Sequence, residues 1–191
     1  MIPKAHCPPA DVFLHAGDIT NTGEVEQLES FSKWLSAYPA EHKVVIAGNH
    51  DITLDAPYYK DRGALRFHGG ERYDCVEAKQ RLTGCTYLED SSANVLGYEI
   101  YGSPYQPSFC DWAFNLPRGE LCDKKWQAIP HQVDVLITHG PAFGLRDVTS
   151  NGEHVGCVDL RKAIEERQVS VSLAGHVHEG YAGLQIRVLN F

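Results

Sequence analysis

The stretch Lys43-Val-Val-Ile-Ala-Gly-Asn-His-Asp51 changes abruptly from apolar to polar residues. Residues 43–47 have the length and β-branched composition of a buried strand, and Gly48 ends that strand. Asn49, His50 and Asp51 follow directly, and each carries a side chain that can bind a metal ion or another ligand. Because ligands of α/β sheets bind beside the carboxyl ends of strands, this stretch predicts a fold class and the position of a site.

The same change from strand to polar residues is expected at three further places. Predicted strands end at Gly17-Asp18, at His139-Gly140 and at Gly175-His176-Val177-His178, and glycine there permits close backbone approach. Apolar residues spaced three and four apart predict helices over residues 23–38 and 158–167. Strands that alternate with helices favour a layered α/β domain. The strands are expected at residues 12–15, 43–47, 95–101, 134–138, 169–174 and 184–189.

The composition argues against several classes of protein. The chain has 191 residues, of which 43% are hydrophobic and 22% charged, as in an ordinary globular domain. Its formal net charge is −8 and its lysines and arginines form no cluster longer than a pair, so we expect no binding to a nucleic-acid duplex. Because we find neither a membrane-length apolar run nor a signal peptide, we expect no membrane partner. The six cysteines form no Cys-x-x-Cys pair, which favours reduced thiols in a cytoplasmic protein.

The residue types at the predicted strand ends favour a metal site. Asp, Asn and His side chains at one sheet edge form a mixed oxygen and nitrogen donor set for divalent Mn, Fe or Zn, and the donors do not decide among these metals. His176 and His178 are two residues apart, so in an extended chain both point to the same side. An Asp can bridge two ions, and paired ions suit phosphoryl hydrolysis because they neutralise the phosphate and activate water. A metal would also allow an acidic protein to hold an anionic phosphate ester.

The polar blocks resemble, in type and order, those of the calcineurin-like metallophosphoesterases: Gly17-Asp18, Gly48-Asn49-His50-Asp51, Thr138-His139 and Gly175-His176-Val177-His178. Residues 109–114 and 152–157 are similar to the metallophosphoesterase-domain-containing branch, which is related to class III cyclic nucleotide phosphodiesterases. The resemblance implies a four-layer α/β sandwich of two mixed β-sheets flanked by helices. It further implies that residues 1–191 form one calcineurin-like phosphoesterase domain, trimmed at both ends relative to the family.

The resemblance also implies a role for each polar residue. It implies a set of metal ligands: Asp18, Asn49, His139, His176 and His178. Asp18 would bridge two ions, His178 would bind only the second ion, and the other three residues would complete the first. His50 would protonate or stabilise the leaving oxygen of the scissile phosphate. Asp51 would orient His50 by accepting its other ring N–H.

One block of the family pattern is missing from this chain. The family begins with Asp-x-His at the end of a first strand, and the sequence contains no Asp-x-His. One metal site therefore keeps four ligands, whereas the other keeps only Asp18 and His178, so we expect one site to be better formed than the other. Without that first strand, residues 12–15 should have an unpaired edge, unless another segment pairs there.

Two functions remain open at this point. The first is a metal-dependent phosphoesterase that hydrolyses a small phosphomonoester or phosphodiester, such as a nucleotide or cyclic nucleotide, by attack of a metal-activated hydroxide. The alternative is a catalytically impaired nucleotide-binding or scaffold protein that keeps the fold but has lost one metal site. The sequence leaves the substrate and the oligomeric state undetermined.

Four further residues have both a structural and a functional interpretation. His15 lies in a predicted buried strand, where a hydrogen-bonded core histidine is more common than a ligand. His154 is either a site residue or part of a solvated loop. Trp112 and Phe114 lie in an aromatic loop, and such residues pack on the core more often than they stack on a nucleobase.

Overall fold

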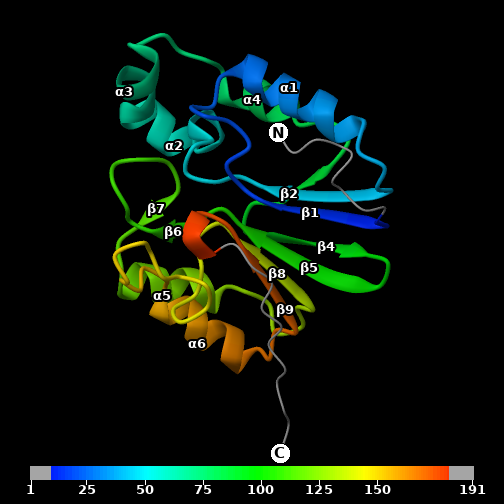
Figure 1. Ribbon diagram of the computed structural model, residues 1–191. Helices are drawn as coiled ribbons and strands as arrows, with labels where there is room; N and C mark the ends of the chain where they lie inside the picture. The colour runs from blue at the N-terminus through cyan, green and yellow to red at the C-terminus, as the bar shows by residue number, and fades with distance from the viewer. Residues whose placement is uncertain (1–9, 181–191) are drawn as a thin grey trace, which may run out of the picture.

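Two β-sheets face each other across the middle of the molecule, and helices cover the outer face of each sheet (Figure 1). The computed structural model describes residues 10–180. The first sheet is parallel throughout, and its strands in spatial order are β1 (Val12–Ala16), β2 (His42–Ile46) and β3 (Thr86–Tyr87). The second sheet is mixed, and its order is β4 (Ser91–Val95), β5 (Tyr98–Ser103), β8 (Val135–Thr138) and β9 (Val171–Ala174). The predicted layered α/β sandwich is confirmed, although only the second of these sheets is mixed.

Helix α1 (Val25–Ser36) lies on the outer face of the first sheet, next to α4 (Cys75–Gln80) (Figure 1). Leu28, Phe31 and Leu35 recur at three- and four-residue steps along α1, and all three are buried against the sheet. The predicted helix over residues 23–38 is therefore confirmed with slightly closer ends. Shorter helical segments follow β2: η2 (Ile52–Leu54), α2 (Ala56–Tyr58), η3 (Tyr59–Gly63) and α3 (Ala64–His68).

Helices α5 (Glu120–Gln127) and α6 (Val158–Glu166) cover the outer face of the second sheet (Figure 1). Trp126 of α5 and Leu160 of α6 are buried in one core cluster with Leu136 of β8. The remaining short elements are β6 (Gln106–Pro107), β7 (Asn115–Leu116) and η4 (His178–Gly180). Together these helices and the two sheets form four layers, with the sheets inside.

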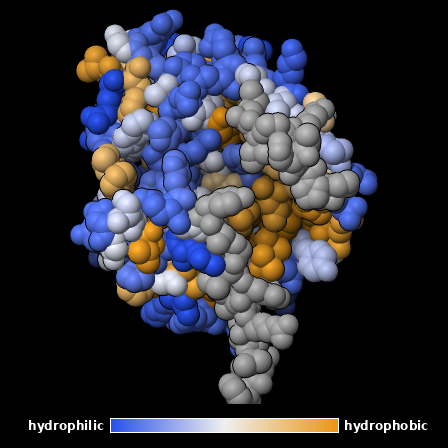
Figure 2. All heavy atoms as spheres, viewed as in Figure 1, coloured by the Kyte–Doolittle hydropathy of each residue, from blue (hydrophilic) through white to orange (hydrophobic). Residues whose placement is uncertain are grey.

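The space between the sheets is filled by aliphatic side chains but is less well covered at one side. Strand β1 lies opposite β8, and β2 lies opposite β5. Val12, Leu14 and Leu173 are only partly buried where β1 and β9 end their sheets, and apolar atoms are visible on this face in Figure 2. Among residues 10–180, β1 pairs with β2 alone. The predicted unpaired edge of this strand is therefore present in the described part of the chain.

Two expectations about secondary structure need correction or lie outside the described residues. A single strand over residues 95–101 is wrong, because β4 and β5 form a hairpin there. Its turn is Leu96-Gly97, where φ is 52° and 88°, values that suit the two central residues of a tight hairpin turn. The strand predicted at residues 184–189 lies outside the described residues. None of the helices within residues 10–180 combines the length and the hydropathy of a membrane-spanning helix.

Candidate metal centre

The carboxyl ends of β1, β2, β8 and β9 meet beside η4 (Figure 1). Each of these strands is followed by at least one of the five predicted ligands, and the structure brings four of them together: Asp18, Asn49, His139 and His176. Ligand atoms of Asp18, His139 and His176 lie within 4.8 Å of one another. These residues come from both sheets, so the packing of one sheet on the other builds the cluster.

His139 is the centre of this donor cluster. Its imidazole is fully buried, and Nδ1 lies 2.8 Å from the carbonyl oxygen of Ala16 at the end of β1. Nε2 lies 2.9 Å from Asn49 Oδ1 and 3.3 Å from Asp18 Oδ1. Asn49 Oδ1 is also 2.8 Å from His176 Nδ1. A histidine that donates one ring N–H to a backbone carbonyl and aims its other nitrogen at oxygen donors is typical of metal ligands.

The protons available in this cluster are too few for its acceptor atoms. The carbonyl of Ala16 can only accept, so His139 Nδ1 must carry the proton of the neutral ring. Nε2 then directs a lone pair at the oxygens of Asn49 and Asp18, and these atoms repel one another. A divalent cation among them would turn this repulsion into attraction. The donor set of one carboxylate, one amide oxygen and two imidazoles therefore fits a first-row divalent metal.

Burial keeps the two histidines neutral. It lowers the pKa of His139, and burial together with the nearby His139 lowers the pKa of His176 to about 4. Metal ions bind the unprotonated imidazole, so neither ring needs to lose a proton to bind a metal at neutral pH. The electrostatics of the cluster thus agree with its geometry.

The backbone around the cluster is tightly packed and locally strained. Asp18 and His176 both have positive φ angles, of 55° and 66°, in the left-handed region that only a few per cent of non-glycine residues adopt. Gly48 permits the approach of three loops, because a Cβ at this position would lie 2.5 Å from His139 Cε1 and would also meet the Asp18 carboxylate. The expectation that glycine permits close approach here is confirmed.

His178 is not part of the donor cluster. We predicted an extended chain in which His176 and His178 point to the same side, and this is wrong. His176 has a left-handed backbone, and the Val177 N–H donates to Gly175 O at 2.7 Å, so the chain turns before η4 begins at His178. His178 is exposed. Within residues 10–180, a second ion could draw only on Asp18 and His178 among the predicted ligands, and this pair does not fit a second metal.

His50 lies beside the cluster with its imidazole held on two sides. Its backbone N–H donates to Asp18 Oδ1 at 3.0 Å, and its Nδ1 lies 2.8 Å from Asn21 O. The ring centroid is 4.4 Å from that of Trp112. Because Nδ1–H donates to a carbonyl, Nε2 is the ring nitrogen that is left to meet a ligand.

Asp51 does not orient His50, contrary to the role that the resemblance implied. Its fully buried carboxylate accepts from Gly48 N–H at 2.7 Å, and from both the N–H and the hydroxyl of Thr20 at 2.8 Å. Ile19 N–H is a further donor, at 3.2 Å. Burial raises the pKa of Asp51 to about 6, and the hydrogen bonds from Gly48 and Thr20 oppose that rise. Asp51 therefore joins the loop after β2 to the loop after β1, and the carbonyl of Asn21 holds His50 instead.

A histidine–carboxylate pair lies in the loop that precedes α6. His154 Nδ1 is 2.8 Å from Asp147 Oδ1, and Gly156 N–H donates to the other carboxylate oxygen at 3.1 Å. Burial alone would raise the pKa of Asp147, but these hydrogen bonds lower it below its usual range. The same loop contacts η4, because Ser150 N–H donates to Glu179 Oε1 at 3.1 Å. Asp147 had no motif to mark it in the sequence, and its burial is what identifies it.

His15 and the two aromatic residues have structural surroundings that differ from one another. His15 packs edge-on against Phe31 of α1, with ring centroids 5.2 Å apart, and its buried Nδ1 has no hydrogen-bond partner among the described residues. The expectation that His15 is hydrogen bonded is therefore wrong. Phe114 is buried in the core, whereas Trp112 packs on His50.

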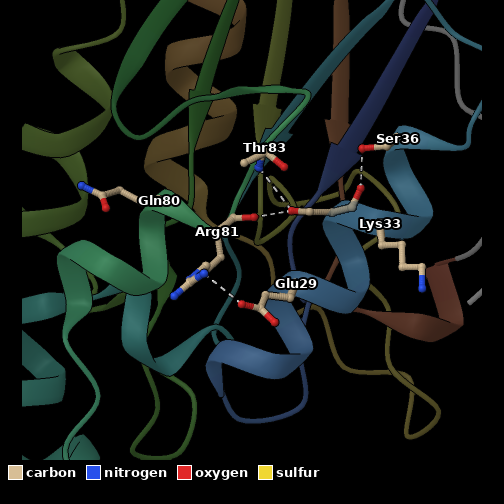
Figure 3. A pocket seen from close by; sticks show the side chains of 7 residues that line it. Glu29, Lys33, Ser36, Gln80, Arg81 and Thr83 are labelled. Carbon is tan, nitrogen blue, oxygen red and sulfur yellow. Dashed lines mark hydrogen bonds and ion pairs between the residues drawn. The ribbon is translucent and has the colours of Figure 1, made fainter.

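A surface hollow of about 330 Å³ lies between α1 and the chain that follows α4, and none of the predicted ligands lines it (Figure 3). Its polar groups largely bind each other, since Glu29 pairs with Arg81 at 3.1 Å and the hydroxyl of Ser32 contacts Arg81 and Thr83. Another group of donors combines Cys122 and Cys157, which are buried in the α5–α6 core, with the half-buried Asp159. Burial raises the pKa of Cys122 to about 12, so this thiol stays protonated. Neither place has the character of the metal cluster.

Comparisons with known proteins agree with this geometry. Residues 1–180 match a family model described as calcineurin-like phosphoesterase. Metallophosphoesterase domain-containing protein 1 of Homo sapiens is 44% identical over 184 residues, which cover 91% of this chain and 56% of that protein. A UPF0046 protein of Caenorhabditis elegans is 37% identical over 187 residues, which cover 91% of this chain and 47% of that protein. One crystal structure shares the fold, with a TM-score of 0.54, 19% identity, and coverage of 80% of this chain and 57% of the other.

The chain thus spans about half the length of the curated relatives that it matches. The family implies divalent metal ions, and the four donors around His139 are where this chain could hold one. The sequence match, the shared fold and the donor cluster all lead to one assignment. The chain belongs to the calcineurin-like phosphoesterase family, in the branch of the metallophosphoesterase domain-containing proteins.

Proposed function

We propose that the chain carries a metal-dependent phosphoesterase site that hydrolyses a small phosphomonoester or phosphodiester. The observation that supports this proposal is that His139 Nε2 faces the oxygens of Asn49 and Asp18 with no proton between them, beside the ring of His176. Family membership supports the same class of reaction. A net charge of −8 gives the protein little general attraction for a phosphate ester, so a bound cation would have to supply it.

Four residues would hold one divalent ion: Asp18, Asn49, His139 and His176. When bound, such an ion neutralises the charge of the phosphate and activates water, which is the chemistry that ester hydrolysis needs. The residues themselves keep their donor atoms in place before the ligand arrives. Ala16 O holds the His139 ring, and His50 N–H and Asp18 Oδ1 hold each other.

His50 would act on the leaving group. Its Nδ1–H is engaged by Asn21 O at 2.8 Å, so Nε2 is the atom that would deliver a proton to the departing oxygen. Trp112 restricts rotation of the ring from one face. Asp51 would contribute indirectly, because its hydrogen bonds to Gly48 and Thr20 fix the loops that carry His50 and Asp18.

A second candidate function is a phosphate-ester or nucleotide-binding protein with little catalytic activity. It is favoured by one observation, the position of His178, which is exposed and outside the cluster. With Asp18 and His178 alone, a second ion would be weakly held, and reactions that need paired ions would be slow.

Metal content and turnover distinguish these functions. After dialysis against Mn²⁺, we expect about one tightly bound ion per chain, and metal-stimulated hydrolysis of bis-p-nitrophenyl phosphate. The variant Asp18→Ala should lose both, whereas His131→Ala, which removes an exposed histidine, should lose neither. Metal binding without turnover would favour the second candidate. A protein that binds no metal would overturn both.

A further inference from the structure

The loop between β6 and β7, residues 108–114, places aromatic rings against two histidines of the site. The Phe109 ring meets His176 edge-on, with centroids 5.8 Å apart and an interplanar angle of 82°. Trp112 meets His50 with centroids 4.4 Å apart. One loop therefore borders both the metal donors and the residue proposed to act on the leaving group.

The aromatic residues of this loop differ sharply in exposure. Phe114 is 1% exposed and belongs to the core. Trp112 is wedged between His50 and Phe67, whose ring centroid lies 4.6 Å away. Phe109 is 62% exposed although it contacts His176. Core packing accounts for the first two rings but leaves most of Phe109 facing solvent.

The backbone around Phe109 is anchored from both sides. The Asn115 side chain accepts from Phe109 N–H at 3.3 Å and donates to the carbonyls of Phe109 and Cys110, at 3.3 and 2.8 Å. Asp111 pairs with Arg62 and Arg66 at 3.4 and 3.5 Å, and its carbonyl accepts from the Tyr58 hydroxyl at 2.7 Å. These bonds hold the backbone that carries the exposed Phe109 ring beside His176.

We propose that Phe109 is a specificity-determining residue, a platform on which a flat ring of the substrate's alcohol portion stacks. This inference rests on the proposed function, since it needs a phosphate ester bound at the donor cluster. An aromatic face that is fixed in advance binds another flat ring at little entropic cost. The favoured substrate class is therefore phosphate esters whose alcohol carries a planar aromatic or heteroaromatic ring.

Binding of two inert phosphonates tests this inference without requiring turnover. Phenylphosphonate and methylphosphonate share the anionic group but differ in the ring, and their affinities for the Mn²⁺-loaded protein can be measured by calorimetry. We expect the wild-type protein to bind phenylphosphonate about 10-fold more tightly than methylphosphonate.

Phe109→Ala should reduce this ratio to about 1 without changing the affinity for methylphosphonate. Phe109→Tyr should keep the preference. Tyr98→Ala removes a ring that is 60% exposed at the far end of β5, and it should also keep the preference.

The outcomes separate this inference from the proposed function. Equal affinity of the wild-type protein for both phosphonates, or a preference that survives in Phe109→Ala, would overturn the role of Phe109 and leave the metal site in place. If neither phosphonate binds the Mn²⁺-loaded protein, the proposed phosphate-ester site itself fails, and the role of Phe109 fails with it. Because Phe109 is exposed, its variants should keep the wild-type melting temperature. An unchanged melting temperature would show that a change in the ratio of the two phosphonate affinities comes from the lost ring and not from unfolding.

Discussion

The donor cluster around His139 and the region around His178 are two sides of one candidate site, but they are built differently. In the cluster, Asn49 and His139 are buried, Asp18 and His176 are half-buried, and each ring or side chain is held by a partner, such as Ala16 O for His139. His178 lies at the start of a three-residue 3₁₀ segment and is exposed.

This difference shows what makes a motif residue into a ligand. His176 and His178 are neighbours in sequence, yet only His176 reaches the cluster, because its left-handed backbone turns its ring toward Asn49. A donor becomes preorganised when the end of a strand and a second hydrogen bond fix it together. Two predictions test this contrast, beginning with the largest expected effect, and a third tests the burial of His15.

Gly48→Ala should destroy the preorganised side of the site. The new Cβ would meet the Asp18 carboxylate and would lie 2.5 Å from His139 Cε1, so we expect a loss of about 3 kcal/mol in the free energy of unfolding. Urea denaturation measures this change. Gly69→Ala is the control, because its φ is +60° but nothing lies within 4 Å, and it should cost only about 1 kcal/mol. Equal effects of the two variants would show that close packing at Gly48 does not matter.

Removing a ligand from each side should produce unequal losses of metal affinity. We expect His176→Ala to weaken Mn²⁺ binding about 100-fold, because His176 shares Asn49 Oδ1 with His139. His178→Ala should weaken it less than about 5-fold, since His178 lies outside the cluster. Calorimetric titration of the metal-free protein gives both values. Comparable losses in the two variants would place His178 in the principal metal site and would refute the contrast.

The buried histidines should make stability depend on pH, with a smaller effect. Burial lowers the pKa of His15 from its usual 6.5 to about 4, so the folded protein favours the neutral ring. Its stabilising contribution is complete above pH 6.5 and is lost as the pH falls toward 4, because the unfolded chain then binds more protons.

The variant His15→Leu isolates this contribution. Since His15 Nδ1 has no hydrogen-bond partner among the described residues, leucine should remain stable at pH 7. Between pH 6.5 and 5, the wild-type protein should lose about 1 kcal/mol more than His15→Leu, as measured by urea unfolding. His131→Leu changes an exposed residue and should keep the wild-type slope. Identical slopes for all three proteins would contradict the burial of a neutral His15.

Local patterns predicted the elements that carry the site. The apolar runs before Gly17, Gly48, His139 and Gly175 indicated strands, and all four are present with ends shifted by at most two residues. The hairpin at Leu96-Gly97 was missed because these two turn residues lie inside a run of residues that otherwise all favour a strand. Periodicity reports burial of one segment at a time, so it cannot locate a reversal of the chain within an apolar stretch.

The identities of the donors follow from the amino-acid sequence alone, because metal chemistry depends on side-chain type and strand ends follow from local composition. Which of these donors meet depends on how the two sheets pack together. Asn49 reaches His139 and His176 across 90 and 127 residues of sequence, and the two sheets must pack together before these contacts exist. The tertiary structure also gave Asp51 its partners in the loop after β1, left Phe109 exposed beside His176, and left His178 exposed and outside the donor group. The physical reason is that hydrogen bonds and burial between distant segments, unlike residue type, leave no periodic trace in the chain.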